Sequence, residues 1–533
     1  MMVSGTDETV MKEMTMSFFK HMGRMFYLVD PAEFMNDSHV APQYISDAIP
    51  YFVLFVLVEY IFSRVKKGKT QVQYNAQETM CSISLGLVQQ TGDILLRGVA
   101  LYPYVYVYEN FRLFDIPLSS TWAYVALFLG VDFGYYLMHR SAHVYHFMWI
   151  GHSVHHSGEY YNFATALRQG TTQAVYSRFF YLPLAFLGFP FAAYMGHNSL
   201  NTLYQFWIHT EIIDKLGPLE VIFNTPSHHR MHHRPPGNCN YAGVLIIWDR
   251  IFGTFVEEKE RRDVYGLAKP LGTFNPLLAN YQHALRMMGI KSKSNDDSTF
   301  TRESGSMEFN FSYFLSIFFT HRHNHRFVFR PLSVIEAFFS PSAWSFSVPS
   351  SSPLKTREKY GTSTAQTPIL AVKIYTFLNF LLTLLLLLQV LLKHRQVQYY
   401  HAVLLMIIPI WSLMSIGMLN ECNPYSLKVE TRRVLVVSCW LVMYSLLKTL
   451  TYFGYGYQSG NAIAGVMVNG YVMFLESPFY LDDNLLTAPL SFMYAVMIFT
   501  LWIVTRRKIR AHFRIVSEPT TTRSWRRDKE KVA

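Results

Sequence analysis

Eight histidines lie in three short stretches whose spacings suit a shared metal ion. They form one HxxxH and two HxxHH motifs: His139 and His143; His152, His155 and His156; and His229, His232 and His233. Only 21 of the 533 residues are histidine, so two HxxHH motifs and an HxxxH are not expected from composition alone. The three stretches together therefore indicate a metal site.

The spacing has a physical meaning, because residues three or four apart in a helix share a face. His139 and His143 can thus bind one ion, as can His152 with His155 or His156. The third motif offers the same choice between its first histidine and either of the other two. Imidazole is a good ligand for iron, zinc or copper. Eight imidazoles exceed what a single ion can use, so we expect two metals.

Three neighbouring residues are candidates for supporting roles. His209 is either a further ligand or a plain histidine at the membrane interface, and His228 is expected to support a ligand ring. Asp132 lies seven residues before His139 in an apolar segment, on the same helical face. A buried carboxylate is costly and usually paired. We expect it to hydrogen-bond a ligand imidazole, with a bond to a neighbouring helix as the alternative.

The composition is that of a membrane protein with several spans. Hydrophobic residues make up 50% of the chain and charged residues only 16%, a balance unusual for a soluble protein. The net charge is +11, but the basic residues flank apolar segments and form no nucleic-acid stripe. Four scattered cysteines give no disulfide framework.

The apolar segments predict an all-α polytopic membrane bundle. The candidate spans lie near 48–63, 79–101, 121–138, 173–196, 369–393, 400–419, 433–453 and 486–504, with weaker ones near 197–213 and 461–476. Residues 64–69 hold four Lys or Arg, which places this loop in the cytoplasm. We expect 173–213 to cross and return as a hairpin. Counting spans from the loop then puts every histidine motif on the cytoplasmic side.

These segments divide the chain into five parts. We expect an N-terminal segment at 1–47, a catalytic membrane domain at 48–285, a polar connecting loop at 286–368, membrane helices at 369–505 and a basic tail at 506–533. His321, His323 and His325 lie in the connecting loop among arginines, a pattern typical of solvated surface. There is no nucleotide-binding motif and no fused cytochrome b5 motif, so electrons must come from outside.

Longer strings around the motifs give the sequence a family resemblance. The order HxxxH, HxxHH, HxxHH is similar to that of the fatty acid hydroxylase superfamily of membrane di-iron enzymes. The strings at 161–169, 205–211, 224–233 and 246–255 resemble its glyceryl ether-cleaving group. The resemblance is strong from about 48 to 285, and after 369 it rests on the hydrophobic pattern.

This resemblance implies an endoplasmic reticulum enzyme that uses iron, dioxygen and tetrahydrobiopterin. Such an enzyme hydroxylates the carbon next to the ether oxygen of an alkylglycerol or lyso ether lipid. The hemiacetal then breaks into a fatty aldehyde and a glycerol derivative. Four polar residues could orient the headgroup, the pterin or the ligand rings, or could simply bond within loops and helix ends: Asn162, Arg168, Gln169 and Glu211.

Other functions fit parts of the pattern. A sterol or fatty acyl hydroxylase of the same superfamily would take electrons from cytochrome b5. A desaturase fits less well, because its first motif usually has four residues between the histidines, whereas three separate His139 and His143. A metal transporter or metal-regulated receptor would be a non-enzyme alternative. The sequence does not indicate an oligomeric state.

Overall fold

The computed structural model describes residues 15–35, 40–66, 72–235, 237–259, 265–267, 271–287, 368–393, 399–423, 425–454, 496 and 498–511. Regular structure in these ranges is helical, apart from one isolated bridge between Phe223 and Leu245. The helical character expected from the sequence is therefore confirmed for the described residues. The described residues form two compact units, one within 1–271 and 280–291 and the other within 272–279 and 360–533.

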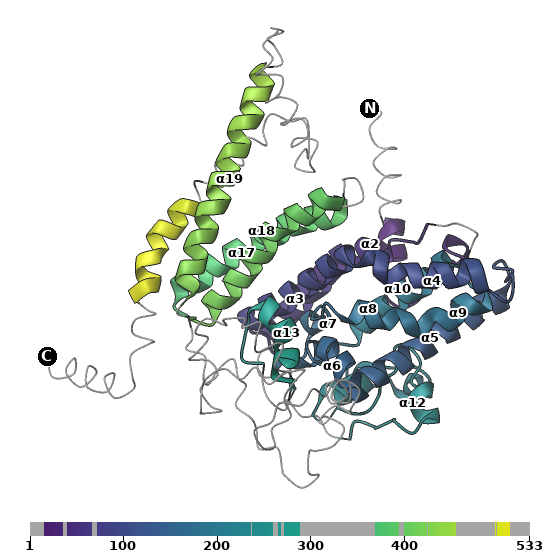
Figure 1. Cartoon of the computed structure of the whole chain (residues 1–533). Coiled ribbons are helices and arrows are strands. Elements are labelled where there is room, and N and C mark those ends of the chain that lie inside the picture. The colour runs from purple at the N-terminus through teal and green to yellow at the C-terminus, as the bar shows by residue number, and fades with distance from the viewer. Residues whose placement is uncertain are drawn as a thin grey trace, which may run out of the picture. The chain divides into compact units, whose positions relative to one another are not determined.

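In the first unit, a helical segment at 15–24 is followed by a short turn and three helices. They are η1 (Pro31–Glu33), α2 (Tyr44–Val65), α3 (Ala76–Leu95) and α4 (Arg97–Phe111) (Figure 1). The Asn75 side chain caps α3 by accepting hydrogen bonds from the backbone amides of Gln77 and Glu78. The apolar segment expected at 79–101 is divided between two helices, because α3 ends at Leu95 and α4 begins two residues later.

The next elements carry the first two histidine motifs. They are α5 (Thr121–Val144), α6 (His146–His152), η2 (His155–Ser157) and α7 (Phe163–Ala166). The HxxxH motif lies on α5, as the spacing predicts. The first HxxHH motif is not one continuous helix, because α6 ends at His152 and a 3-10 turn begins at His155.

The chain reverses as a hairpin within the expected range 173–213, but the turn lies at 188–190 and not near residue 196. The hairpin consists of α8 (Gln173–Ser177), η3 (Arg178–Tyr181) and α9 (Leu182–Leu187), followed by α10 (Phe191–Trp207). Gly188 ends α9 with a φ of 105°, and Pro190 caps α10. A left-handed glycine and a proline cannot continue a helix. The chain therefore reverses here, and Arg178 donates a hydrogen bond to the Tyr194 hydroxyl across the hairpin.

The remaining elements of this region are short. They are η4 (Gly217–Val221), α11 (Pro226–His233), α12 (Ile247–Ile251) and α13 (Pro276–Met287). The third histidine motif lies on α11, where Pro226 occupies the first turn. Proline suits that position because the missing amide would have no helical partner there. The hydrophobic core of the unit packs α5 against α9 and α10 through Leu127, Val131, Leu184 and Leu200.

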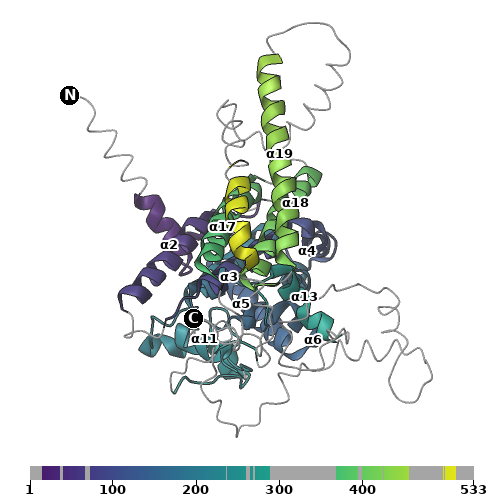
Figure 2. The same cartoon turned by 90° about the vertical axis from the view of Figure 1, so that its left-hand side faces the viewer.

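The second unit contains three long helices: α17 (Leu370–Lys393), α18 (Tyr399–Asn420) and α19 (Ser426–Gly454). Within it, α18 lies beside both α17 and α19 (Figures 1 and 2). A buried ion pair between Glu430 and Arg433 joins them, since Tyr375 and Ser415 donate to Glu430 while Arg433 donates to Asn379. The span expected at 433–453 thus begins with a buried charged residue.

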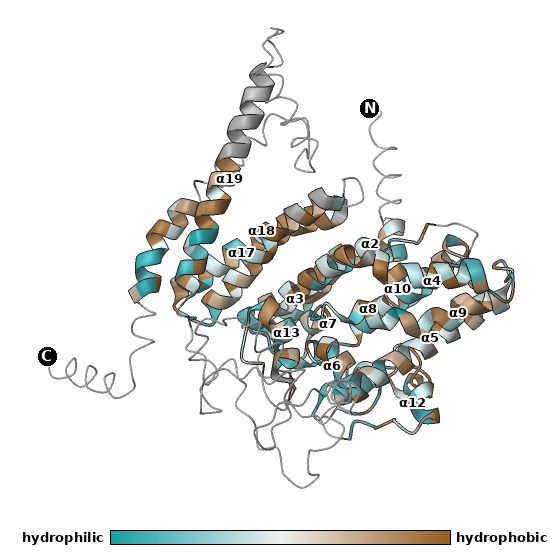
Figure 3. Cartoon of the chain, viewed as in Figure 1, coloured by the Kyte–Doolittle hydropathy of each residue, from teal (hydrophilic) through white to brown (hydrophobic). Residues whose placement is uncertain are grey.

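Two described helices are long and apolar enough to cross a membrane by length and composition. These are α2, with a mean hydropathy of 1.8, and residues 370–388 of α17, with a mean hydropathy of 2.0. Figure 3 shows hydrophobic residues along both helices and along α18. The larger number of spans expected from the sequence stays a prediction. The weak span at 461–476, most of the segment at 486–504 and His321, His323 and His325 lie outside the described residues.

Candidate metal centre

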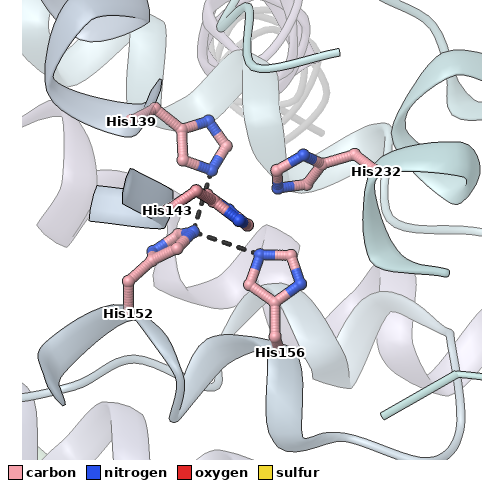
Figure 4. A group of neighbouring side chains, drawn as sticks. All are labelled: His139, His143, His152, His156 and His232. Atoms are coloured by element: carbon pink, nitrogen blue, oxygen red, sulfur yellow. Dashed lines mark hydrogen bonds between the residues drawn. The ribbon is translucent and has the colours of Figure 1, made fainter. Parts of the chain in front are cut away.

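Nine buried histidines form two compact groups. One, here called the five-histidine group, consists of His139, His143, His152, His156 and His232. The other, the four-histidine group, consists of His155, His209, His229 and His233. Within each group the candidate ligand atoms lie within 4.8 Å of one another. Figure 4 shows the five rings of the first group converging on a shared centre.

The two groups share the HxxHH motifs between them. Residues four apart stay together, so His152 and His156 join the first group and His229 and His233 join the second. The middle histidine of each motif, His155 or His232, belongs to the other group. Along α11, successive residues turn by about 100°, so positions i+3 and i+4 point to opposite sides of position i. The sequence left this pairing open, and the structure favours the spacing of four.

Hydrogen bonds hold five of the rings by their Nδ1 atoms. Backbone carbonyl oxygens lie 2.6–2.9 Å from four of these atoms: Tyr241 O from His139, Arg168 O from His155, Gln205 O from His209 and Cys239 O from His232. The fifth, in His152, contacts the Gln173 Oε1 atom at 3.1 Å. A carbonyl only accepts, so Nδ1 carries the proton and Nε2 presents its lone pair to the group.

The buried rings are neutral. Burial lowers the pKa of His155 to about 4. Burial also lowers the pKa values of His232 and His233 well below the usual value, and neighbouring imidazoles lower these two pKa values further. Neutral imidazole is the form that binds metals. His155 and His209 then present two Nε2 lone pairs to each other at 3.2 Å, and no proton lies between them. A cation between such lone pairs removes their repulsion.

The donor set therefore fits a pair of metal ions. Within the described part of the chain, the Nε2 atoms of His232 and His233 are buried without a hydrogen-bond partner. Buried polar atoms without partners are rare in folded proteins and call for an explanation such as a bound ion. All nine donors are imidazole nitrogens, which suit iron, zinc and copper.

Asp132 does not support a ligand ring, so this expectation is wrong. It is fully buried on α5 and accepts four hydrogen bonds, from the amides of Val244 and Leu245, the Trp248 indole and the Asn201 side chain. The donors come from the segment before α12, from α12 itself and from α10. The expected alternative, bonding to a neighbouring element, is the one observed, and it ties three segments together.

Asp249 supports the centre in a way that the sequence analysis missed. Its carboxylate accepts from the amides of Tyr241 and Ala242, each at 2.8 Å. The carbonyl of Tyr241 in turn anchors His139, and that of Cys239 anchors His232. In the sequence, the signal for this role was the single carboxylate within the apolar string 246–255. That string entered the sequence analysis only as part of the family resemblance.

Glu59 is a second missed residue. This buried carboxylate on α2 accepts hydrogen bonds from the Phe163 amide at 2.7 Å and from the hydroxyls of Tyr74 and Thr210. Thr210 follows His209 directly in the chain, so Glu59 fixes the turn that carries this ligand candidate. A carboxylate inside the apolar segment 48–63 was the available signal.

An ion-pair cluster holds α11 to the same turn. Arg230 and Arg234 both bind Glu258, at 2.7 and 2.8 Å. Arg230 also donates to the carbonyls of Thr210 and Ile213. The arginines thus brace α11 at its C-terminal end and connect that helix to the turn that carries His209.

The four polar residues proposed to orient a cofactor are all engaged in protein contacts. Asn162 caps α7 and donates to Gln73 O, while Arg168 is buried and pairs with Glu78 at 3.1 Å. Gln169 lies 3.4 Å from the Nδ1 atom of His155, and Glu211 accepts from the Tyr265 hydroxyl. Their binding of a cofactor stays a prediction.

His228 joins neither group. It lies 4.0 Å from Glu220 and packs against the Phe255 ring. Burial lowers the pKa of His228 to about 4. The backbone carbonyl of His228 accepts a hydrogen bond from the Asn240 side chain. This backbone contact connects His228 to the segment that anchors His232.

Comparison with known proteins places this geometry in a family context. Residues 124–254 match the fatty acid hydroxylase family. The chain is 47% identical over 264 residues to the alkylglycerol monooxygenase of Homo sapiens, covering 49% of this chain and 58% of that protein. It is also 47% identical over 266 residues to the alkylglycerol monooxygenase of Xenopus tropicalis, with 49% and 58% covered.

A more distant relative has a different name. The ornithine lipid hydroxylase of Rhizobium tropici is 33% identical over 136 residues, covering 23% of this chain and 39% of that protein. No solved structure matches the chain. The matched part spans a little over half the length of the alkylglycerol monooxygenases. Residues 124–254 thus match the fatty acid hydroxylase family, and the chain is similar in sequence to the alkylglycerol monooxygenases.

Proposed function

We propose that the chain is a membrane di-iron monooxygenase that cleaves the ether bond of alkylglycerols by hydroxylating the carbon next to the ether oxygen. The observation that carries this proposal is the pair of adjoining buried imidazole groups. The chain is 47% identical, over 49% of its length, to proteins named alkylglycerol monooxygenase. The products would be a fatty aldehyde and a glycerol derivative.

The nine histidines would hold two irons, one in each group. Iron bound by neutral imidazoles supplies, together with dioxygen and an electron donor, an oxidant strong enough for an unactivated C–H bond. The chain's own contribution is rigidity and the exclusion of water. The carbonyl contacts to His139, His155, His209 and His232 fix the rings, and their burial keeps bulk solvent from the reacting carbon.

We further propose that the enzyme lies in the endoplasmic reticulum membrane with its metal centre toward the cytoplasm. The apolar residues Val53, Leu57, Val58 and Ile61 of α2 are each more than half exposed in the isolated chain. Lipid would cover such a surface. The basic loop at 64–69 follows this helix directly and supports the cytoplasmic orientation.

The proposed electron donor is tetrahydrobiopterin, which the resemblance to the glyceryl ether-cleaving group implies. The competing function is a sterol or fatty acyl hydroxylase that uses cytochrome b5. The deciding experiment offers purified full-length protein a labelled alkylglycerol with tetrahydrobiopterin, and separately with a cytochrome b5 system. Aldehyde release with the pterin alone supports the proposal, while turnover with cytochrome b5 alone contradicts it.

Histidine variants test the role of each group in that assay. His155→Ala and His232→Ala should abolish turnover while the protein remains in the membrane, because each removes one ring from a different group. His21→Ala is the matched control, since His21 lies in the N-terminal segment and belongs to neither group. Full activity in either cluster variant would contradict the proposed function. One tightly held zinc without oxygen consumption would favour the non-enzyme alternative.

A further inference from the structure

An exposed apolar patch covers η4 and α12. Its members are each between 44% and 65% exposed: Leu219, Val221, Ile222, Ile251 and Phe252. Contiguous exposed apolar side chains mark an interaction surface more often than isolated ones do. This patch is called the η4–α12 patch below.

Backbone contacts make the patch one continuous surface. The Ile246 amide donates to the carbonyl of Ile222 at 2.9 Å, next to the bridge between Phe223 and Leu245. Arg250 donates to the carbonyl of Glu220 at 3.1 Å. The two elements are therefore held side by side, although about 30 residues separate them in the chain.

The patch continues the exposed apolar stripe of α5. Val125, Leu129 and Leu137 of that helix are 36–45% exposed and lie at intervals of four or eight residues. Phe133 completes the series, and the Phe252 ring stacks on it at a centroid distance of 5.8 Å. Phe252 also stacks on Tyr136 at 5.4 Å. Leu129 and Leu137, which flank Phe133 in the stripe, are exposed. The contact between Phe252 and Phe133 therefore places α12 at the same level along α5 as the exposed stripe.

A basic side chain borders the patch. Arg250 is exposed, precedes Ile251 and Phe252, and places its guanidinium 3.8 Å from the centroid of the Phe255 ring. Arginines of this kind cover apolar surface with their stems and reach phosphate groups with their charged ends. Apolar side chains beside a basic residue are the chemistry of a segment that lies in the interfacial layer of a bilayer.

We propose that η4 and α12 form a wedge inserted into the interfacial layer of the phospholipid leaflet beside the metal centre. This inference rests on the proposed membrane location of α5. The wedge carries Asp249, whose carboxylate accepts a hydrogen bond from the Tyr241 amide. The carbonyl of the same residue, Tyr241, contacts the His139 ring. The lipid surface and one face of the metal centre are thus joined through a single short helix.

Site-specific fluorescence in vesicles tests the wedge. Among the cysteines, Cys81, Cys239 and Cys422 are buried and Cys439 is exposed, so Cys439→Ser provides the background for labelling. Ile251→Cys and, as a second position, Leu219→Cys receive an environment-sensitive fluorophore in the full-length chain. The protein is placed in phosphatidylcholine vesicles that contain nitroxide lipids labelled near the headgroup or deep in the acyl chain.

We expect both labels to shift to shorter emission wavelengths and to be quenched more by the shallow nitroxide than by the deep one. Val125→Cys on the α5 stripe is the positive control. Asp214→Cys is the aqueous control, because the Asp214 side chain is 78% exposed. Aqueous iodide should quench the Asp214 label and spare the wedge labels.

Two outcomes overturn the wedge. Iodide quenching of the Ile251 and Leu219 labels equal to that of the Asp214 label would place the patch in water. Protection from both iodide and nitroxide that depends on protein concentration would assign the patch to a second copy of the chain. Absence of nitroxide quenching at Val125 would instead refute the membrane location of α5, which separates failure of the proposed function from failure of the wedge alone.

Discussion

Single hydrogen bonds determine what the histidines can do. Four ring Nδ1 atoms contact backbone carbonyls, in His139, His155, His209 and His232, and these contacts turn the Nε2 lone pairs inward. The carbonyls belong to residues whose side chains are irrelevant to the contact. No spacing rule in the sequence could therefore identify them.

The sequence predicted the ligand candidates better than their supports. The eight motif histidines were found because a repeated spacing is visible without a structure, whereas the solitary His209 could only be left open. The partner expected for Asp132 was wrong, because its donors Val244 and Leu245 lie more than 110 residues further along the chain. Such a pairing depends on the tertiary fold and not on helical periodicity.

Glu59 provides a test at the residue scale. Glu59→Ala should lower metal affinity or activity by about 10–100-fold, because substitutions of residues that hold metal ligands in position have effects of that size. The loss should concentrate on the four-histidine group, since Glu59 holds Thr210 beside His209. The measurement is the iron content per chain, together with the spectroscopic signature of each iron.

Two variants control for a general loss of folding. Glu59→Gln should retain most of the iron, because its amide oxygen still accepts from Phe163 and the Thr210 hydroxyl can turn to accept from its NH₂ group. Asp47→Ala lies on the same helix, away from both groups, and should keep full iron content. Equal iron in Glu59→Ala and the parent would refute the positioning role.

At the scale of elements, hydropathy located the apolar segments but not their breaks. The hairpin at 173–213 was expected with its turn near residue 196, whereas Gly188 and Pro190 place the turn earlier. The turn residues were visible in the sequence, but glycine and proline are also tolerated inside membrane helices. Hydropathy alone therefore could not fix the residue at which the chain reverses.

Asp132 provides a test of how the elements are joined. Asp132→Ala should lower the free energy of unfolding by at least about 3 kcal/mol, because the buried amides of Val244 and Leu245 lose their acceptor. Denaturant unfolding of the detergent-solubilised protein measures the change. Asp115→Ala is the control, since the Asp115 carboxylate is 88% exposed and pairs with Arg112. Equal stability of both variants would show that Asp132 is not a clamp.

Gly170 tests the close approach of two histidine-bearing segments. A Cβ at this position would lie 2.0 Å from the carbonyl oxygen of Gly151, next to His152. Gly170→Ala should therefore destabilise the protein by about 1–3 kcal/mol or more and reduce its iron content. The matched substitution Gly98→Ala meets no atom within 4 Å and should be neutral or stabilising by up to about 1 kcal/mol. Similar iron retention in both variants would argue against a tight 151–170 contact.

For the whole molecule, the metal centre draws ligands from distant parts of the chain. Its histidines extend from His139 on α5 to His233 on α11, with His209 after α10 between them. The sequence indicated that these stretches meet and that two metals are needed. It could not indicate that each HxxHH motif divides its rings between both groups, because that depends on how α6, η2 and α11 face one another.

The iron content of the purified full-length chain tests this account most directly. We predict about two irons per chain, one for each group, because the nine imidazoles divide into five and four. His233→Ala, which removes a ring from the four-histidine group alone, should lower the content toward one. A parent protein that binds one zinc and no iron, or a His233→Ala variant that keeps both irons, would contradict the two-group metal centre.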